Sequence, residues 1–360
     1  MTALPASPFA PLARPPFDRW MAGELSQLTE ETLDRLGSRL VALLLGGGYG
    51  RGEGGVLEVD GKQRPYNDLD LFVVVTDPRG VTSDLAHVAH RAEARLGIAV
   101  DFSHPLTPGD IRRWECRLMW HELLGAHRVL YGAPDALAQH APPGVAAAPP
   151  PVEASRLLLN RGAGLLRARR VALALEPPPD PEFVRRNAMK ALQSAGDAFL
   201  IARGELPSTL TARVDALPDA CVALPAPVQT AVVAGYREAV RFHFAPDRGK
   251  GAVADDALLT RATAVWLTAF LAVEEVRHAR PFPDLTRYLA WRGAREPAGF
   301  SPRTWARNLK AALARRRWSF ASPHEGLYRS LPRLLEAPPG AAGWDAESAS
   351  ALADWQARPA

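Results

Sequence analysis

Five of the eleven residues from Ala141 to Pro151 are prolines, and this segment constrains the fold more than any other feature of the chain. Proline fixes its backbone φ angle and has no amide hydrogen, so the segment must lie outside helices and central strands. It divides a region of mixed strand and helix patterns from one that is almost wholly helical. With 360 residues and 47% hydrophobic content, the chain can bury two moderate cores. We therefore expect an α+β fold, in which a small mixed sheet flanked by helices precedes an α-helical domain.

The expected domain boundaries follow this change of pattern. Residues 1–20 are interrupted by prolines and are expected to form a poorly ordered arm. The mixed domain is assigned to residues 21–140, and a helical domain to residues 152–336, which the family resemblance described below implies to be substrate-binding-like. Residues 337–360 are expected to form a C-terminal tail.

Apolar runs and the residues that interrupt them predict the elements of the first domain. From Glu24 onward, apolar residues recur at helical spacing and end in the run LVALLL, which either completes a helix or forms a short buried strand. Glycines directly after the run are typical of a strand. Residues 69–75 (LDLFVVV) and 98–102 (IAVDF) have the β-branched and aromatic character of strands. The other elements expected here are helices over 83–96 and 108–126 and a strand over 129–132.

Helical periodicity dominates the sequence beyond Pro151. Within residues 181–203, apolar residues recur every three or four positions, as on a helix packed in a bundle. The most apolar stretch, from Ala262 to Val273, is about a dozen residues long, whereas a membrane span needs roughly 20. We expect it to be a buried helix. Helices are expected over 152–175, 181–203, 225–243, 255–279 and 302–318.

Charge and cysteine content restrict the partners and the compartment. The chain has 43 basic and 39 acidic residues, a net charge of +4, so no strong field directs it to nucleic acid or to a membrane surface. Its two cysteines are too few for a disulfide framework and fit a reducing compartment. We expect a cytoplasmic protein without membrane association. Arg315 to Arg317 beside Trp318 form one short basic and aromatic cluster, which keeps an RNA partner open.

A dense glycine cluster follows the LVALLL run. Six glycines lie between Gly46 and Gly54 in the segment LLLGGGYGRGEGGV. Such a loop lets backbone amides approach a ligand closely, and converging amides form a concavity for an anion. Arg51 would add a charge-assisted contact to phosphate. A flexible connector is the alternative, but the embedded Arg51 and Glu53 favour phosphate binding.

Two familiar phosphate motifs do not explain this loop. Gly50, Gly52 and Gly55 match G-x-G-x-x-G, but the dinucleotide-binding motif requires a helix directly afterwards. Here Asp60-Gly61 stands between two short extended segments, which predicts a β-hairpin with a type I′ turn. The string of a Walker A loop does not occur. A dinucleotide-dependent oxidoreductase therefore stays only as a competing hypothesis.

Two aspartates at the start of the LDLFVVV strand form the second notable feature. Asp68 and Asp70 are separated by one residue, so strand alternation directs both side chains to the same face. Carboxylates held close together repel each other and are costly to bury, and a divalent cation resolves that conflict. Asp101 completes a cluster if its strand pairs with this one. For Asp101, a buried structural aspartate is the alternative.

A glycine loop after a strand, an Asp-x-Asp on the next strand and a third aspartate on a later one together resemble the DNA polymerase β nucleotidyltransferase superfamily. The string GGYGRGE, from Gly47 to Glu53, is similar to that of the uridylyltransferases that modify PII signalling proteins. Their loop is followed by S-D-I-D-L, where this chain has NDLDL. The resemblance covers roughly residues 35–132. This chain departs from the pattern in the longer stretch between loop and aspartates and in Gly48, where serine is common.

The resemblance implies a Mg²⁺-dependent nucleotidyltransferase, which moves a nucleoside monophosphate from a nucleoside triphosphate to an acceptor and releases pyrophosphate. The acceptor is a small molecule, a protein or an RNA end. Asp68, Asp70 and Asp101 would be catalytic and would hold two Mg²⁺ ions. The residues assigned to the nucleotide and its phosphates are Gly47, Gly48, Arg51, Glu53 and Lys190.

Two points stay open within this interpretation. Lys190 lies on one helical stripe with Arg186 and Gln193, and such a stripe is commonly only a solvated polar face. The chain is alternatively a catalytically inactive nucleotide-binding or regulatory protein of the same fold. The presence of all three carboxylates together with GGYGRGE argues against this alternative.

Overall fold

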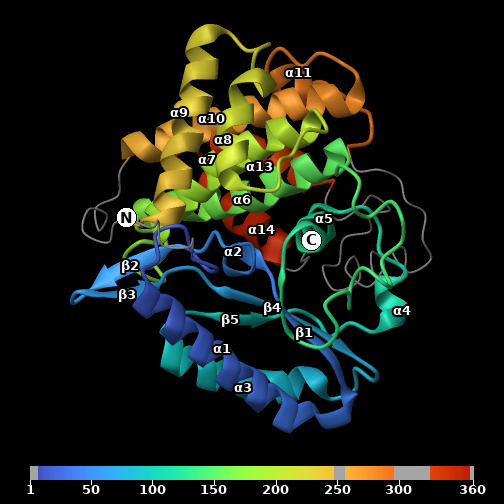
Figure 1. The fold of residues 1–360 in the computed structure, drawn as a ribbon. Coiled ribbons are helices and arrows are strands. Elements are labelled where there is room, and N and C mark those ends of the chain that lie inside the picture. The colour runs from blue at the N-terminus through green and yellow to red at the C-terminus, as the bar shows by residue number, and fades with distance from the viewer. Residues whose placement is uncertain (1–6, 247–255, 296–324, 357–360) are drawn as a thin grey trace, which may run out of the picture. The chain divides into compact units, whose positions relative to one another are not determined.

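The computed structural model describes residues 7–246, 256–295 and 325–356, and the chain folds into two compact units (Figure 1). The first unit comprises Met1–Pro150, Leu206–Asp215 and Val240–Asp247. The second comprises Pro151–Glu205, Ala216–Ala239 and Arg248–Ala360. The first boundary falls at the end of the proline-rich segment. Two later segments, Leu206–Asp215 and Val240–Asp247, nevertheless belong to the first unit. The expected boundaries place both segments in the helical domain.

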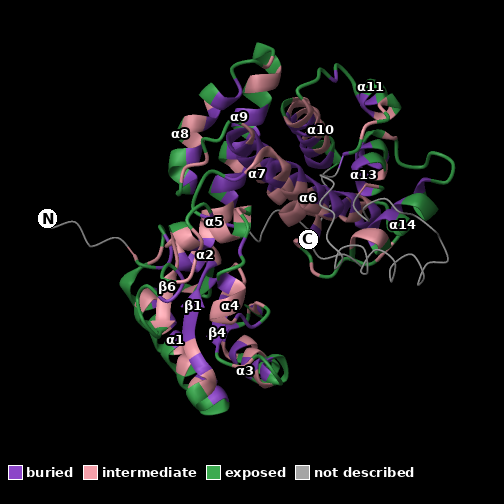
Figure 2. Ribbon diagram, turned by 90° about the vertical axis from the view of Figure 1, so that its right-hand side faces the viewer, coloured by how far each residue is buried: buried purple, intermediate pink, exposed green. Residues whose placement is uncertain are grey.

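A four-stranded sheet with the order β5-β4-β1-β6 organises the first unit. β1 (Leu40–Leu45) is antiparallel to both β4 (Leu69–Val75) and β6 (Arg128–Tyr131), whereas β4 is parallel to β5 (Val100–Phe102). The LVALLL run is thus a strand, and the two central strands are buried almost throughout (Figure 2). A sheet with this mixed direction is not the parallel dinucleotide-binding architecture. The described residues therefore lack the parallel fold and the helix after the glycine loop that the oxidoreductase hypothesis requires.

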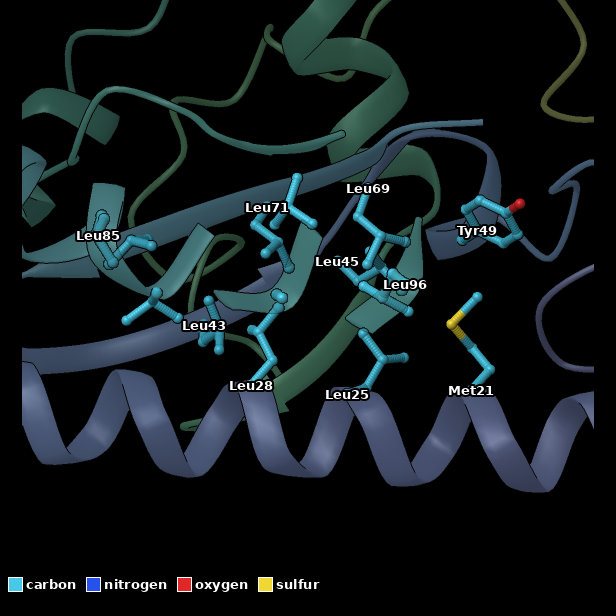
Figure 3. Packing of buried hydrophobic residues seen from close by; sticks show 14 of the residues in the cluster. Met21, Leu25, Leu28, Leu43, Leu45, Tyr49, Leu69, Leu71, Leu85 and Leu96 are labelled. Atoms are coloured by element: carbon cyan, nitrogen blue, oxygen red, sulfur yellow. The ribbon is translucent and has the colours of Figure 1, made fainter. Parts of the chain in front are cut away.

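Helices α1 (Pro15–Leu36) and α3 (Val81–Leu96) cover one face of this sheet. Figure 3 shows Leu25 and Leu28 of α1 directed toward leucines of the two central strands, and Met21 directed toward Tyr49. Burial of each such side chain contributes about 1.5–3 kcal/mol. The opposite face packs against α4 (Pro108–Ile111), α5 (Leu118–Gly125) and the segment that follows them. Both faces of β1 and β4 are therefore covered within the described part of the chain, whereas the strand ends lead into loops.

The boundaries of several expected elements are corrected. The arm expected over residues 1–20 contains the start of α1, because prolines are tolerated in the first turn of a helix, and the described part also buries Phe9. The helix α3 begins after Gly80 and ends, as its glycine predicts, at Gly97 in the left-handed conformation, with φ of 71°. The helical stretch expected over 108–126 is two separate short helices. A 3-10 turn over Gly37–Arg39 connects α1 to β1.

Helices make up the second unit, as its periodicity predicts. The helices that match expected stretches are α6 (Pro151–Ala172), α7 (Phe183–Ala202), α9 (Ala226–Phe244) and α10 (Asp256–His278). The helices that were not expected are α8 (Leu210–Ala220), α11 (Leu285–Ala290), α13 (Leu327–Glu336) and α14 (Trp344–Gln356). The residues of α8 and α9 are divided between the two units. The helix expected over 302–318, with Arg315 to Arg317 and Trp318, lies outside the described residues.

The expected C-terminal tail is also corrected, because α14 is packed into the second unit. Trp344 and Leu352 are buried, and Arg170 of α6 donates hydrogen bonds to the Asp345 carboxylate at 2.6 Å and to the Ser348 hydroxyl at 2.6 Å. These contacts join the end of the chain to the first helix of the unit. They are long-range contacts that the local composition of residues 337–360 does not indicate.

Within the described residues, α10 is the one helix whose length and composition would allow it to cross a membrane. It nevertheless packs one face into the core of its unit, with Trp266 and Phe270 fully buried. Its Glu274 is also fully buried, accepts a hydrogen bond from Ser155 at 2.6 Å and pairs with Arg277 at 2.7 Å. Burying a charged carboxylate is costly unless it is paired and hydrogen-bonded, as Glu274 is, so these contacts fit a helix packed against protein.

Candidate active site

Three carboxylates lie at one end of the sheet. Asp70 is the register partner of Asp101 on the parallel strand β5, so both side chains leave the sheet on the same face. Asp68 directly precedes β4, where strand alternation assigns it to that face as well. Asp68 and Asp70 are half-buried, and Asp101 is exposed. The alternative that Asp101 is a buried structural aspartate is therefore wrong.

The glycine loop reaches the same end of the sheet because β1 and β4 run in opposite directions. The Gly46 amide donates to the Asp70 carbonyl oxygen at 2.8 Å. Gly47 follows with φ of 57°, and a Cβ atom on it would lie only 1.8 Å from Asp70 Oδ2. Only glycine lets the backbone come this close to the carboxylate. The loop and the carboxylate pair, which are separate in the sequence, thus form one site.

The loop has a fixed conformation and is not the flexible connector that the sequence left open. Residues Gly47–Gly50 form one helical turn, α2, in which the Gly50 amide donates to the Gly46 carbonyl oxygen at 2.9 Å. A Cβ atom on Gly50 would lie 2.2 Å from the Leu45 carbonyl oxygen, so this position also requires glycine. The glycines therefore serve close backbone packing at the end of β1.

Arg51 and Glu53 are directed toward each other. Arg51 Nε lies 3.2 Å from Glu53 Oε2, and only 15% of the Arg51 side chain is exposed. The other carboxylate oxygen of Glu53, Oε1, accepts a hydrogen bond from the Leu210 amide at 2.6 Å. The sequence pattern assigns both residues to phosphate binding, and in the structure each has a protein partner. Gly47 and Gly48, assigned to the same role, lie in the turn beside Asp70.

The predicted hairpin is confirmed and is tied back to the loop. β2 (Val56–Val59) and β3 (Lys62–Pro65) are antiparallel, and the turn residues Asp60 and Gly61 have φ of 50° and 73°, as a type I′ turn requires. At its base, the buried Tyr49 hydroxyl donates to the Gly55 carbonyl oxygen at 2.6 Å and accepts from the Tyr66 amide at 2.9 Å. Burial raises the pKa of Tyr49 well above its ordinary value, and the charge of Asp68 raises it further. Tyr49 therefore stays protonated and fixes the hairpin to α2.

Replacing Tyr49 by phenylalanine is expected to lower the free energy of unfolding by about 1–3 kcal/mol, because buried backbone groups at the hairpin base lose a partner. Urea unfolding followed by circular dichroism measures the loss. Tyr131→Phe, on the partly exposed strand β6, is the control and should change stability by less than about 0.5 kcal/mol. Equal stability of the Tyr49→Phe and wild-type proteins would contradict this role of the hydroxyl.

Several residues around the loop were not identified from the sequence. Asn67 Oδ1 accepts from the Gly55 amide at 2.7 Å, and its position directly before the aspartates was a usable signal. Glu122, Arg213 and His243 come from α5 and from the two later segments of the first unit. Nothing in their local sequence connects them with a loop that precedes them by 67 or more positions.

Lys190 lies on α7, in the second unit, where it is half-buried. Its neighbour on the stripe, Arg186, forms a two-pronged ion pair with Asp180, at 2.6 and 3.1 Å. Such a partly exposed pair is compatible with a polar face, so that alternative stays open. The assignment of Lys190 to the nucleotide stays a prediction.

The donor set at the sheet end has the chemistry that Mg²⁺ prefers. In the part of the chain that the structure describes, no three His, Cys, Asp or Glu side chains are arranged as a ready metal-binding group. Mg²⁺ does not require one, because it commonly uses one or two carboxylates and completes its shell with water and substrate phosphates. The half-buried Asp70, with Asp101 in register and glycine amides beside it, supplies hard oxygen donors of that kind.

Comparison with known proteins adds no identification. No protein-family model matches the chain, and no curated protein matches it.

Proposed function

We propose that this chain is a Mg²⁺-dependent nucleotidyltransferase with a polymerase β-like first unit and that it acts in the cytoplasm. One observation carries the proposal: the Gly47 backbone lies directly against the Asp70 carboxylate, with Asp101 in register on the next strand. Backbone amides that bind phosphate and carboxylates that bind metal are useful together only for a substrate that has both, such as a metal–triphosphate complex.

The roles of the chain's own residues follow from this arrangement. Asp68 and Asp70 would hold the metal ions, and the amides of Gly47 and Gly48 would face the β and γ phosphates. Two Mg²⁺ ions, when bound, stabilise the charge that develops in an in-line displacement. Asp101, the exposed carboxylate, would accept the proton of the acceptor hydroxyl. The acceptor oxygen then bonds to the α-phosphorus, the bond from that phosphorus to the bridging oxygen breaks, and pyrophosphate leaves.

The proposal is tested by incubating the protein with each of four α-labelled nucleoside triphosphates, Mg²⁺ and a fractionated lysate. Label is expected to enter one acceptor pool, a small molecule, a protein or an RNA, with equal release of pyrophosphate. Nuclease and protease treatment of the labelled fraction identifies which of these three classes the acceptor belongs to. Binding of triphosphate without label transfer or pyrophosphate release in any fraction would instead establish the inactive nucleotide-binding alternative and overturn the enzymatic proposal.

A further inference from the structure

Four charged side chains form a continuous network beside the glycine loop. Arg51 pairs with Glu53 at 3.2 Å, and its Nη1 atom lies 3.9 Å from Oε2 of Glu122 on α5. The other oxygen of Glu122 accepts a hydrogen bond from Arg213 at 2.8 Å. Arg213 also donates from Nε to the Pro207 carbonyl oxygen at 2.8 Å, and 5% of its side chain is exposed. All of these residues belong to the first unit.

The charged groups of this network are paired with one another. Among the described residues, two guanidinium groups face two carboxylates, and Arg51 is paired with Glu53 at 3.2 Å. Burial raises the pKa of Glu122, but the charges of Arg51 and Arg213 outweigh this and hold its pKa below the usual value. Glu122 is therefore ionised at neutral pH. A phosphate that drew Arg51 away from Glu53 and Glu122 would leave two carboxylates poorly compensated.

The backbone of Glu53 is fixed as firmly as its side chain. Its amide donates to the Gly48 carbonyl oxygen at 2.7 Å, and its carbonyl oxygen is 2.8 Å from Nε2 of His243. The side chain meanwhile accepts from the Leu210 amide at 2.6 Å. The loop is thus held at its far end by segments distant in the sequence, while its near end, at Gly47, faces Asp70.

We propose that Arg51 is a positioning residue and not a phosphate ligand: with Glu53, Glu122 and Arg213 it forms an internal ion network that holds the glycine loop against Asp70. The effect of this network on turnover rests on the proposed function, whereas its effect on the conformation of the glycine loop does not. Because the network is shared, Arg213 acts on the loop glycines through Glu122 and Arg51.

Hydrogen exchange of the free protein, read by mass spectrometry over residues 46–55, tests the network without any substrate. Arg51→Met and Arg213→Met are each expected to speed exchange of these amides by about tenfold or more, because shared buried networks couple strongly. Arg79→Met is the matched control, since Arg79 is 90% exposed in a surface pair with Asp77. Arg51→Lys and Arg213→Lys serve if a methionine variant does not fold, because a lysine keeps the charge but lacks the fork that reaches two partners.

Affinity for inorganic tripolyphosphate with Mg²⁺ is measured on the same variants. A positioning role predicts that the Arg51 and Arg213 variants lose affinity to a similar extent. The proposal would be overturned if only the Arg51 variants lost affinity for tripolyphosphate. It would also be overturned if neither the Arg51 nor the Arg213 variants changed the hydrogen exchange of residues 46–55. If the wild-type protein transfers no nucleotide to any acceptor, the proposed function fails, while accelerated exchange in both sets still supports the network as the device that holds the loop.

Discussion

Replacement of Asp70 by asparagine is expected to slow pyrophosphate release by about a thousandfold or more, because losing a metal-binding charge removes several kcal/mol of transition-state stabilisation. Asparagine has nearly the same shape as aspartate, so the close contact with Gly47 can persist and the fold is expected to be retained. Steady-state pyrophosphate release at saturating Mg²⁺ and triphosphate measures the loss. Circular dichroism and urea unfolding check that the variant is folded.

Asp77→Asn is the matched control for this prediction. Asp77 follows the opposite end of β4, where hydrogen bonds from Arg79 lower the pKa of its carboxyl to about 2. Its replacement removes the same charge beyond the other end of the strand without touching the proposed site, and activity should stay within about twofold of wild type. If Asp70→Asn keeps a tenth or more of the wild-type rate, Asp70 does not carry the reaction.

The elements that could be predicted from the sequence are those with strong local signals. The β-branched run over 69–75, the Asp60-Gly61 turn and the glycine after α3 each determine their structure through nearby residues alone. The LVALLL run was ambiguous because its character as a strand depends on pairing with β4. The start and the end of the chain were misjudged for a similar reason, since the burial of Phe9 and Trp344 depends on distant partners.

The site could be predicted in part for the same physical reason. Strand alternation alone is enough to direct Asp68 and Asp70 to one face, and the pairing of β4 with β5 adds Asp101. The direct contact between Gly47 and Asp70 depends on the antiparallel register of two strands, which the sequence does not specify. The interpretation of Arg51 depends on Glu122 and Arg213, and their approach to it is a property of the folded chain.

Gly47→Ala is expected to reduce pyrophosphate release by about a hundredfold or more, because a misplacement of about 1 Å in a reacting group has an effect of that size. The added methyl group would lie 1.8 Å from Asp70 Oδ2, so either the loop or the carboxylate must move. Alanine also adopts the left-handed conformation of Gly47, with φ of 57°, only at a cost of about 1–2 kcal/mol. The rate of pyrophosphate release and the free energy of unfolding in urea are both measured.

Gly61→Ala separates these two effects. Gly61 also has a left-handed backbone, with φ of 73°, but a Cβ atom on it would have no neighbour within 4 Å. Both variants therefore incur a similar backbone cost, and only the one at Gly47 overlaps a carboxylate. Activity should fall in Gly47→Ala and persist in Gly61→Ala, even where the two lose comparable stability. If both variants kept the wild-type rate, the contact between the loop and Asp70 would be irrelevant to turnover, and the observation that carries the proposed function would no longer support it.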